Sequence, residues 1–181
     1  MAHFNLGKAL LATGRVDEAV ARFREAIAND PSFTDAYGAL GTALLRLGRP
    51  EEALKQYEEI LRRNPESAEA CDQMGLALQE MGRLTEAMKY FREALRLNPE
   101  YGAAHYDLGI LLHKMGRLDE AIAQYREAIQ RLPGMAEIRN YLGIALAATG
   151  RLDEAAVQFR EALKLKPDYA EARANLAKAT R

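Results

Sequence analysis

The segment GILLHKMGRLDEAIAQYREAIQRLP, residues 109–133, contains two stretches of helical periodicity joined by a turn centred on Gly116. Apolar residues spaced three and four apart lie on one face of an α-helix. Glycine is common just past a helix C-terminus, where φ becomes positive. The second stretch stops at Pro133, and proline cannot continue a helix. The segment therefore predicts a helix–turn–helix unit.

The same plan recurs five times with a fixed period of 34 residues. The first glycine column consists of Gly7, Gly41, Gly75, Gly109 and Gly143. The turn glycines are Gly14, Gly48, Gly82, Gly116 and Gly150. Alanine, aromatic and proline columns follow in phase: Ala19, Ala53, Ala87, Ala121 and Ala155; Phe23, Tyr57, Phe91, Tyr125 and Phe159; Pro31, Pro65, Pro99, Pro133 and Pro167. A period in this range is typical of a solenoid or repeat array.

The composition is that of an ordinary soluble protein, with 181 residues, 49% of them hydrophobic, and a formal net charge of -1. Nucleic-acid-binding proteins usually carry a basic excess, so we expect no nucleic-acid partner. No apolar run approaches the length needed to span a bilayer, and the N-terminus lacks the pattern of a signal peptide. The single cysteine, Cys71, excludes an intrachain disulfide framework and favours a reducing, cytoplasmic setting.

The small residues predict how the helices pack. The first glycine column falls inside a helix, where glycine costs up to about 1 kcal/mol relative to alanine. We expect it to permit close approach of the partner helix, with second-helix alanines such as Ala121 and Ala128 as neighbours. Acidic or hydroxyl pairs such as Asp119-Glu120 open each second helix, where they suit the helix dipole and can cap free N–H groups.

These columns closely resemble those of the tetratricopeptide repeat (TPR) family, whose unit is a 34-residue helix–turn–helix. The resemblance implies an all-α solenoid of antiparallel helix pairs in a right-handed superhelix, with first helices lining a concave groove. It covers one array over residues 1–181, with repeats 1–33, 34–67, 68–101, 102–135 and 136–169. Residues 170–181 form the first helix of a sixth unit or a C-terminal cap. The chain enters its first repeat part-way through a helix, so we expect it to be a segment of a longer one.

Some positions depart from the family pattern. The large aromatic expected four residues before the first glycine occurs only as Tyr37, while the other units have His3, Cys71, His105 and Arg139. Ile60 interrupts a second small column, and Pro50 replaces an apolar residue. We expect looser helix packing at Arg139 and Ile60.

No catalytic constellation is present, because the sequence has no P-loop, GxGxxG, HExxH or GxSxG motif. His105 and His113 lie eight residues apart on one predicted helix, but no carboxylate or cysteine is placed to complete a metal site. A buried thiol is the better interpretation of Cys71 than a nucleophile. We therefore predict no enzyme activity, no cofactor and no metal.

The family resemblance implies that ligands contact first-helix positions of the groove. In this sequence the predicted partner-binding residues are Phe4, Lys8, Arg46, Asp72, Leu76, Glu80, Tyr106, Asp107, Ile110, His113, Asn140, Tyr141 and Ile144. Neither the family's carboxylate clamp nor its asparagine ladder is matched at these positions. The acidic residues favour a ligand with basic groups, and the apolar residues toward the C-terminal half favour either a contact surface or packing between neighbouring helices.

The sequence thus predicts a non-enzymatic protein-interaction scaffold that binds a peptide or partner segment in the groove. Two alternatives remain open. One is an arm of a larger enzyme, such as a glycosyltransferase, and the other is a self-assembling scaffold. No membrane contact is expected, because the sequence has no segment for it.

Overall fold

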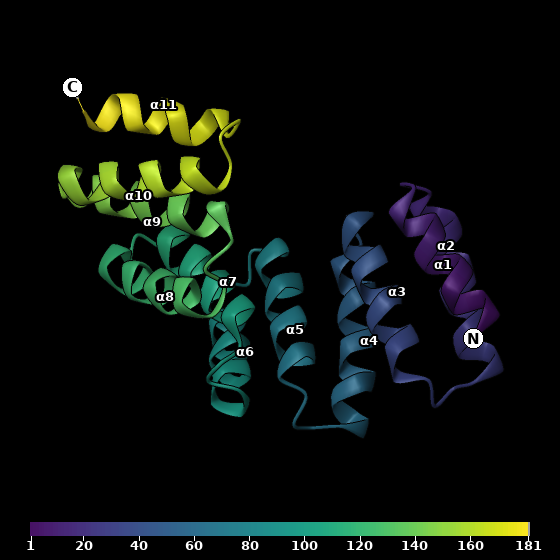
Figure 1. Cartoon of the computed structure of the whole chain (residues 1–181). Helices are drawn as coiled ribbons and strands as arrows, with labels where there is room; N and C mark the ends of the chain where they lie inside the picture. The colour runs from purple at the N-terminus through teal and green to yellow at the C-terminus, as the bar shows by residue number, and fades with distance from the viewer. Residues whose placement is uncertain (181) are drawn as a thin grey trace. The chain divides into compact units, whose positions relative to one another are not determined.

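The computed structural model describes residues 1–180, and within that range the chain is all-α, with eleven helices and no strand (Figure 1). The helices are α1 (Ala2–Ala12), α2 (Val16–Asn29), α3 (Thr34–Arg46), α4 (Pro50–Arg63), α5 (Ala68–Glu80), α6 (Leu84–Leu97), α7 (Gly102–Lys114), α8 (Leu118–Arg131), α9 (Ala136–Ala148), α10 (Leu152–Leu165) and α11 (Ala170–Ala179). None of them is long and apolar enough to cross a membrane.

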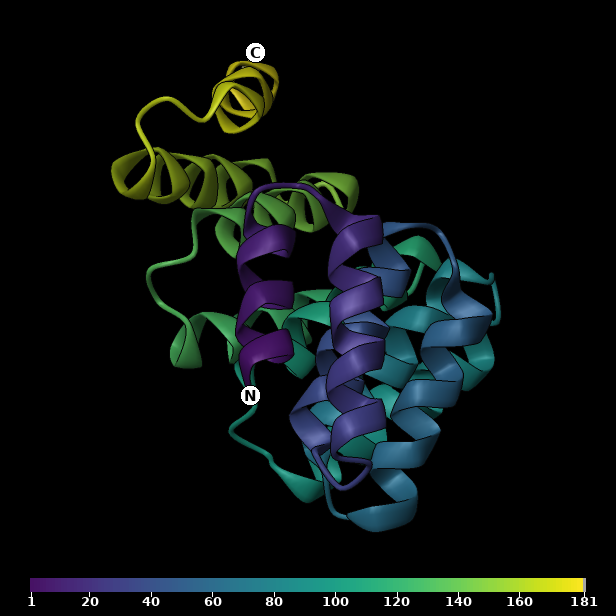
Figure 2. The ribbon, with the colours of Figure 1, turned by 90° about the vertical axis from the view of Figure 1, so that its right-hand side faces the viewer.

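The helices form two compact units, residues 1–97 with α1 to α6, and residues from Asn98 onward with α7 to α11. In unit 1, the hairpins are α1/α2, α3/α4 and α5/α6, and α2 and α4 pack on the first helix of the next hairpin. Figure 2 shows α1 and α2 side by side. In unit 2, hairpins α7/α8 and α9/α10 are joined through α8 and α9, and α11 packs on α10. The predicted helix–turn–helix units are therefore confirmed.

The turn inside each hairpin is a Schellman motif. Gly48 has a φ of 66°, and the N–H of Arg49 donates to the carbonyl of Leu44 at 2.9 Å. The turn glycines of the other four repeats also have positive φ, and the arginine that follows each makes the corresponding bond. This pattern satisfies carbonyls that the helix end would leave without a donor.

The mid-helix glycines do permit close packing, but their neighbours differ from the alanines that the sequence predicted. A Cβ atom on Gly41 would lie 2.5 Å from the ring of Tyr57, and one on Gly109 would lie 2.6 Å from the ring of Tyr125. The same relation holds in the other three repeats. The aromatic column therefore fills the space over the glycine column, because a flat ring can lie directly on a helix backbone that has no side chain.

The acidic residues that open the second helices do not cap them, contrary to the prediction. The residue before α4 is Arg49, and its side chain makes no cap hydrogen bond. Instead, Glu52 accepts a hydrogen bond from Nε of Arg49, and its carboxylate lies 2.5 Å from Nη2 of that arginine. Equivalent pairs three residues apart occur at the other four second helices. The glutamates are thus neutralised by the arginine that follows each turn glycine.

The variable residue four positions before the first glycine has the same role in two repeats, and so does the equivalent residue of α11, Arg173, which precedes Ala177. The hydroxyl of Tyr37 donates to the carbonyl of Pro31 at 3.2 Å, and Nη2 of Arg173 donates to that of Pro167 at 2.6 Å. Nε2 of His105 lies 3.0 Å from the carbonyl oxygen of Pro99. Three chemically different side chains therefore fasten the start of a first helix to the loop before it.

Candidate functional site

Unit 1 contains an open pocket of about 600 Å³ between α1, α3, α4 and α5. Its position matches the predicted groove, because most of its walls come from the first helices α1, α3 and α5, while α4 supplies the floor. The lining residues are Phe4, Thr34, Asp35, Gly38, Ala39, Thr42, Tyr57, Ile60, Asn64, Ser67, Glu69, Ala70 and Gln73.

The pocket exists because α3 carries small residues toward it. Gly38, Ala39 and Thr42 line it. At the position equivalent to Gly38, repeat one has Phe4 and repeat four has Tyr106. Phe4 packs on the second-helix ring of its own repeat, Phe23, at a centroid distance of 5.9 Å. Gly38 supplies no such ring, so the corresponding space in repeat two stays open.

Ile60 forms part of the floor and explains how repeat two tolerates a large residue in a small column. It is 8% exposed, and its Cδ1 would lie 3.8 Å from a Cβ atom on Gly38, an ordinary van der Waals separation. Because Ile60 also lines the open pocket, the expectation of looser helix packing at this residue stays a prediction. The missing side chain of Gly38 provides the room that the extra carbons of Ile60 require.

The lining of the pocket includes Tyr57, whose hydroxyl donates to Oε1 of Gln73 at 3.3 Å. Burial raises the pKa of Tyr57 to about 12, and a hydrogen bond with Thr42 opposes that rise. The phenol therefore stays neutral at physiological pH and acts only in hydrogen bonding.

In unit 1 the predicted site residues are scattered. Phe4 is the one member of the predicted set that lines the pocket. Lys8 stands over the ring of Phe4, with Nζ 5.6 Å from the centroid, and Arg46 donates to the carbonyl of Leu11 at 3.4 Å. Glu80 is exposed and Leu76 half-buried, whereas Asp72 is only 1% exposed. In this structure the acidic surface predicted at Asp72 is therefore not accessible to a ligand.

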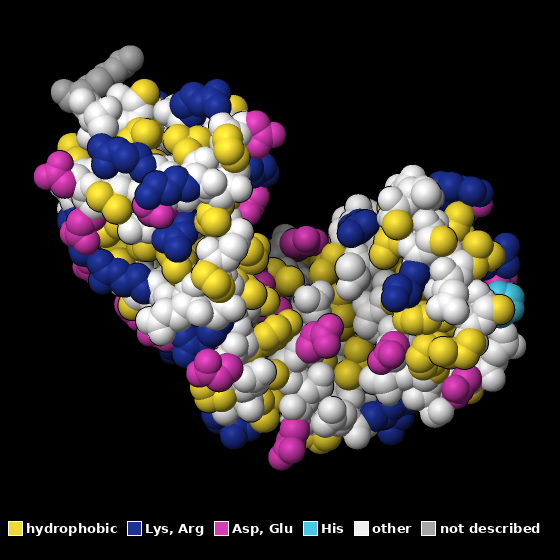
Figure 3. All heavy atoms as spheres, in the orientation of Figure 1, with side chains coloured by type: hydrophobic (Ala, Val, Ile, Leu, Met, Phe, Trp, Pro, Cys, Tyr) yellow, Lys and Arg dark blue, Asp and Glu magenta, His cyan; other side chains and the backbone are white. Residues whose placement is uncertain are grey.

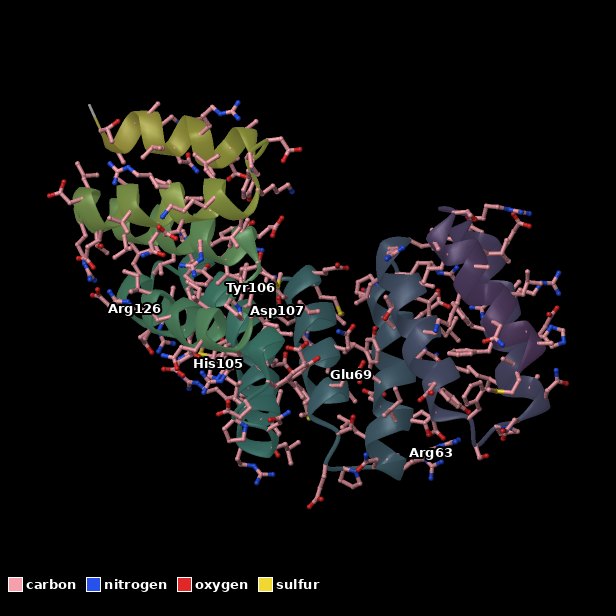
Figure 4. All side chains as sticks on the ribbon, viewed as in Figure 1. Arg63, Glu69, His105, Tyr106, Asp107 and Arg126 are labelled. Carbon is pink, nitrogen blue, oxygen red and sulfur yellow. The ribbon has the colours of Figure 1, made fainter. Side chains whose placement is uncertain are left out.

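In unit 2, Tyr106 and Tyr141 pack against each other and against Tyr125 (Figure 4 labels Tyr106). The centroid distances are 5.8 Å between Tyr106 and Tyr141 and 6.1 Å between Tyr125 and Tyr141. Burial raises the pKa of neighbouring Asp107 to about 6. For these two tyrosines the contacts favour packing between neighbouring helices. This was the second of the two interpretations of the apolar residues toward the C-terminal half of the chain.

The remaining predicted residues of unit 2 have different surroundings. Asn140 is 0% exposed, donates to the hydroxyl of Tyr169 at 3.3 Å and accepts from Asn175 at 3.1 Å, so it fastens α11. Ile110 and His113 are half-buried, and burial lowers the pKa of His113. Ile144 lines a second, mainly apolar pocket of about 150 Å³ between α9, α10 and α11.

The two histidines considered for a metal site have separate roles. Nδ1 of His105 lies 2.8 Å from Oε1 of Gln124, and its Nε2 contacts the Pro99 carbonyl described above. Within residues 1–180, no group of three His, Cys, Asp or Glu side chains could hold a metal ion. Cys71 is buried, and burial raises the pKa of its thiol, which keeps it protonated.

Sequence reasoning missed the floor of the pocket and the wall formed by the loop after α4. The 34-residue pattern assigns Tyr57 and Ile60 to the scaffold only, and Asn64 and Ser67 lie outside the first-helix positions that carry the predicted site. One signal was available: Gly38 is the smallest residue in its column and faces the largest residue in the opposing column, Ile60.

Comparison with known proteins agrees with the fold. A family model described as tetratricopeptide repeat matches residues 4–68, 73–136, 114–170 and 142–181, and the chain belongs to this family. No curated protein matches significantly.

Several solved structures are similar to this chain. One is TTC0263, a thermophilic TPR protein of Thermus thermophilus, with 28% identity, coverage of 99% of this chain and 97% of that one, and a TM-score of 0.82. Another is MamA, with 27% identity, coverages of 91% and 96%, and a TM-score of 0.74. A third is YrrB, described as a TPR protein with an unusual peptide-binding site, with 25% identity, coverages of 97% and 90%, and a TM-score of 0.69.

Proposed function

We propose that this chain is a non-enzymatic protein-interaction module that binds an extended peptide segment along its first helices. The observation that carries the proposal is the pocket of about 600 Å³ in unit 1. Its volume falls within the roughly 300–1,000 Å³ typical of ligand sites, and its floor combines aromatic and aliphatic side chains with a few polar groups. The peptide-binding site described for YrrB, a relative in fold, supports the same class of function.

The test is to fill the pocket by introducing the residues that occupy the equivalent positions of another repeat. Gly38→Tyr combined with Ile60→Ala reproduces the pair Tyr106 and Ala128 of repeat four. A displayed library of random dodecapeptides is panned against the wild-type chain and this variant. We expect peptides retained by the wild type to lose binding to the variant. Ala21→Tyr, which adds the same side chain at an exposed position of α2, serves as the control.

Circular dichroism separates loss of binding from loss of fold, because a filled pocket leaves helix content unchanged. Peptides that bind the wild type and the filled variant equally well would contradict the assignment of this pocket. Retention of no peptide by the wild type would contradict the proposed function as a whole.

The apolar residues of unit 2 form the second part of the proposal. Ile110 and Ile144 are half-buried on α7 and α9, and we propose that they contribute apolar contacts to a segment bound by unit 2 itself. Ile110→Glu with Ile144→Glu should reduce peptide capture while helical circular dichroism persists. Unchanged capture would restrict the binding surface to unit 1.

The two alternatives lack an observation in the structure that favours them. Light scattering over a concentration series tests self-assembly, and a monomer at every concentration would exclude it as the main role. The sequence of the surrounding gene product tests whether the array is an arm of a larger enzyme.

A further inference from the structure

The charge of the pocket in unit 1 is one-sided. Its lining includes two carboxylates, Asp35 at the start of α3 and Glu69 at the start of α5, and no lysine, arginine or histidine. Both side chains are exposed. Figure 4 labels Glu69 on α5, and Figure 3 shows acidic side chains amid apolar surface over α3, α4 and α5. Lys8 and Arg46 lie on α1 and α3 but do not line the pocket.

These two carboxylates differ from the glutamates of the second helices. Glu18, Glu52 and Glu86 each form an ion pair with the arginine three residues before them. Asp35 and Glu69 form no ion pair or side-chain hydrogen bond within residues 1–180. These three glutamates are therefore neutralised, whereas the two carboxylates of the pocket are left available.

The side-chain oxygen atoms of four neutral residues of the pocket already take part in hydrogen bonds. The hydroxyl of Thr42 donates to the carbonyl of Gly38 at 3.0 Å, and Oε1 of Gln73 accepts from Tyr57. Oγ of Ser67 accepts from the N–H of Ala70, and Oδ1 of Asn64 accepts from the N–H of Glu66, both at 3.2 Å. A ligand consequently finds its strongest unused acceptors in the two carboxylates.

The floor suits the stem of a long basic side chain. Half-buried Phe4 supplies an aromatic ring and Ile60, which is 8% exposed, an aliphatic edge, while the fully buried ring of Tyr57 lies beneath them. Lysine and arginine bury their methylene stems along apolar surface and keep the charged head near water. Their cations are also attracted to aromatic faces, and the ring of Phe4 already attracts Lys8 in this way.

The competing occupant is an anionic group, because the pocket includes the N-terminal turns of α3 and α5 and helix N-termini attract anions. Asp35 and Glu69 occupy those first turns, so each helix end already has a negative charge. An acidic ligand would be repelled by both.

We propose that the pocket between α1, α3, α4 and α5 binds a basic side chain, arginine or lysine, of an extended peptide. The stem lies on Phe4 and on the accessible edge of Ile60, and the cation is held by Asp35 and Glu69. This inference rests on the proposed peptide-binding function. It specifies the class of partner as a peptide that contains a basic residue and whose flanking residues lie along the first helices.

The experiment uses the full chain and the same dodecapeptide library. Peptides retained by the wild type are sequenced, and the tightest is synthesised with citrulline replacing arginine or N-acetyllysine replacing lysine. Two protein variants are compared, Asp35→Asn with Glu69→Gln in the pocket, and Asp17→Asn with Glu58→Gln at exposed positions of α2 and α4. The two pairs change the net charge equally.

We expect enrichment of arginine or lysine at one peptide position. The neutral replacement in the peptide and the pocket pair in the protein should each weaken binding about tenfold or more, because a charge-assisted hydrogen bond is lost. The control pair should leave the affinity within about twofold, as expected for solvent-screened charges.

The outcomes separate this inference from the proposed function. Peptides that require an open pocket but show no basic enrichment, or that bind the pocket pair as tightly as the wild type, overturn the inference and leave peptide binding intact. Enrichment of aspartate or glutamate overturns it in favour of the anionic occupant. Equal binding to the filled variant Gly38→Tyr with Ile60→Ala overturns the inference together with the assignment of this pocket, and retention of no peptide by the wild type overturns both the inference and the proposed function.

Discussion

At the scale of single residues, Gly38 and Gly41 lie one helical turn apart on α3, yet they have opposite surroundings. A Cβ atom on Gly38 would meet Ile60 at 3.8 Å, whereas one on Gly41 would meet the ring of Tyr57 at 2.5 Å. Gly38→Ala should raise the free energy of unfolding by about 0.5–1 kcal/mol, because alanine favours the helix and fits. Gly41→Ala should lower it by about 1–3 kcal/mol, because the ring must move.

Urea unfolding followed by circular dichroism measures both values, and each variant is the control for the other because the chemical change is identical. A stabilising Gly41→Ala would show that the ring of Tyr57 relaxes without cost. A destabilising Gly38→Ala would show that the pocket floor has less room than the structure indicates.

Asp107 gives a prediction about pH. Burial raises its folded-state pKa from an ordinary value of 3.8 to about 6, so the folded protein binds this proton more tightly than the unfolded chain. Below about pH 4 the carboxyl of Asp107 is protonated in both states and does not affect stability. Between about pH 4 and pH 6 the unfolded chain ionises more readily than the folded protein, so the free energy of unfolding falls, and the loss is complete above pH 6. Asp107→Asn should stabilise the protein by up to about 3 kcal/mol at pH 8 and have no such effect near pH 3.

The measurement is thermal or urea unfolding of wild type and variant between pH 3 and pH 8. Asp168→Asn, at an exposed loop position, is the matched control and should give a difference that stays near zero throughout. A difference between Asp107→Asn and wild type that does not change with pH would contradict a raised pKa for Asp107.

At the scale of helices, α11 is held by α10 and by a small polar cluster centred on buried Asn140 of α9. Asn140→Ala leaves the hydroxyl of Tyr169 and the amide of Asn175 without this partner. We expect faster amide exchange in α11, corresponding to a loss of about 1 kcal/mol of local stability, because two half-buried polar groups each lose a bond.

Hydrogen exchange with mass spectrometry localises the effect. Tyr169→Phe removes only one of the two bonds and should produce a smaller change in α11. Unaltered protection of α11 in Asn140→Ala would mean that its apolar contacts, such as that of Ala172, suffice to hold it.

The helices themselves were predictable, because glycine, aromatic and proline columns report local backbone and packing requirements that recur every 34 residues. The positive φ of Gly48 follows from such a column, and so does the close helix approach at Gly41, although its neighbour is the ring of Tyr57 where the sequence predicted alanines. The pocket was less predictable, since it arises from the volumes of residues on four helices at once. The space at Gly38 is part of a pocket that Phe4 and Gln73 also line, and Ile60 fills just part of it. The burial of Asp72 likewise depends on neighbours that the 34-residue pattern does not specify.

At the scale of the whole chain, one column of leucines shows how the position of a repeat in the array determines how much a side chain contributes to the free energy of unfolding. Leu40 and Leu142 are each 3% exposed, because α3 packs on α2 and α9 packs on α8. The equivalent residue of α1, Leu6, is 46% exposed, and within unit 1 the neighbours of α1 are α2 and α3. Each repeat in a solenoid draws its stability from its own helices and from the interface with its neighbours.

The same substitution should therefore have unequal effects along the array. Leu40→Ala and Leu142→Ala should each lower the free energy of unfolding by about 2–4 kcal/mol, because each leaves a cavity in a packed interface. Leu6→Ala should cost less than about 1 kcal/mol, because its side chain is already half in solvent. Urea unfolding of the three variants, followed by circular dichroism, checks the order. A cost for Leu6→Ala equal to that of Leu40→Ala would mean that the exposed face of α1 is covered in solution, and sedimentation of wild type and variant would then show whether a second copy covers it.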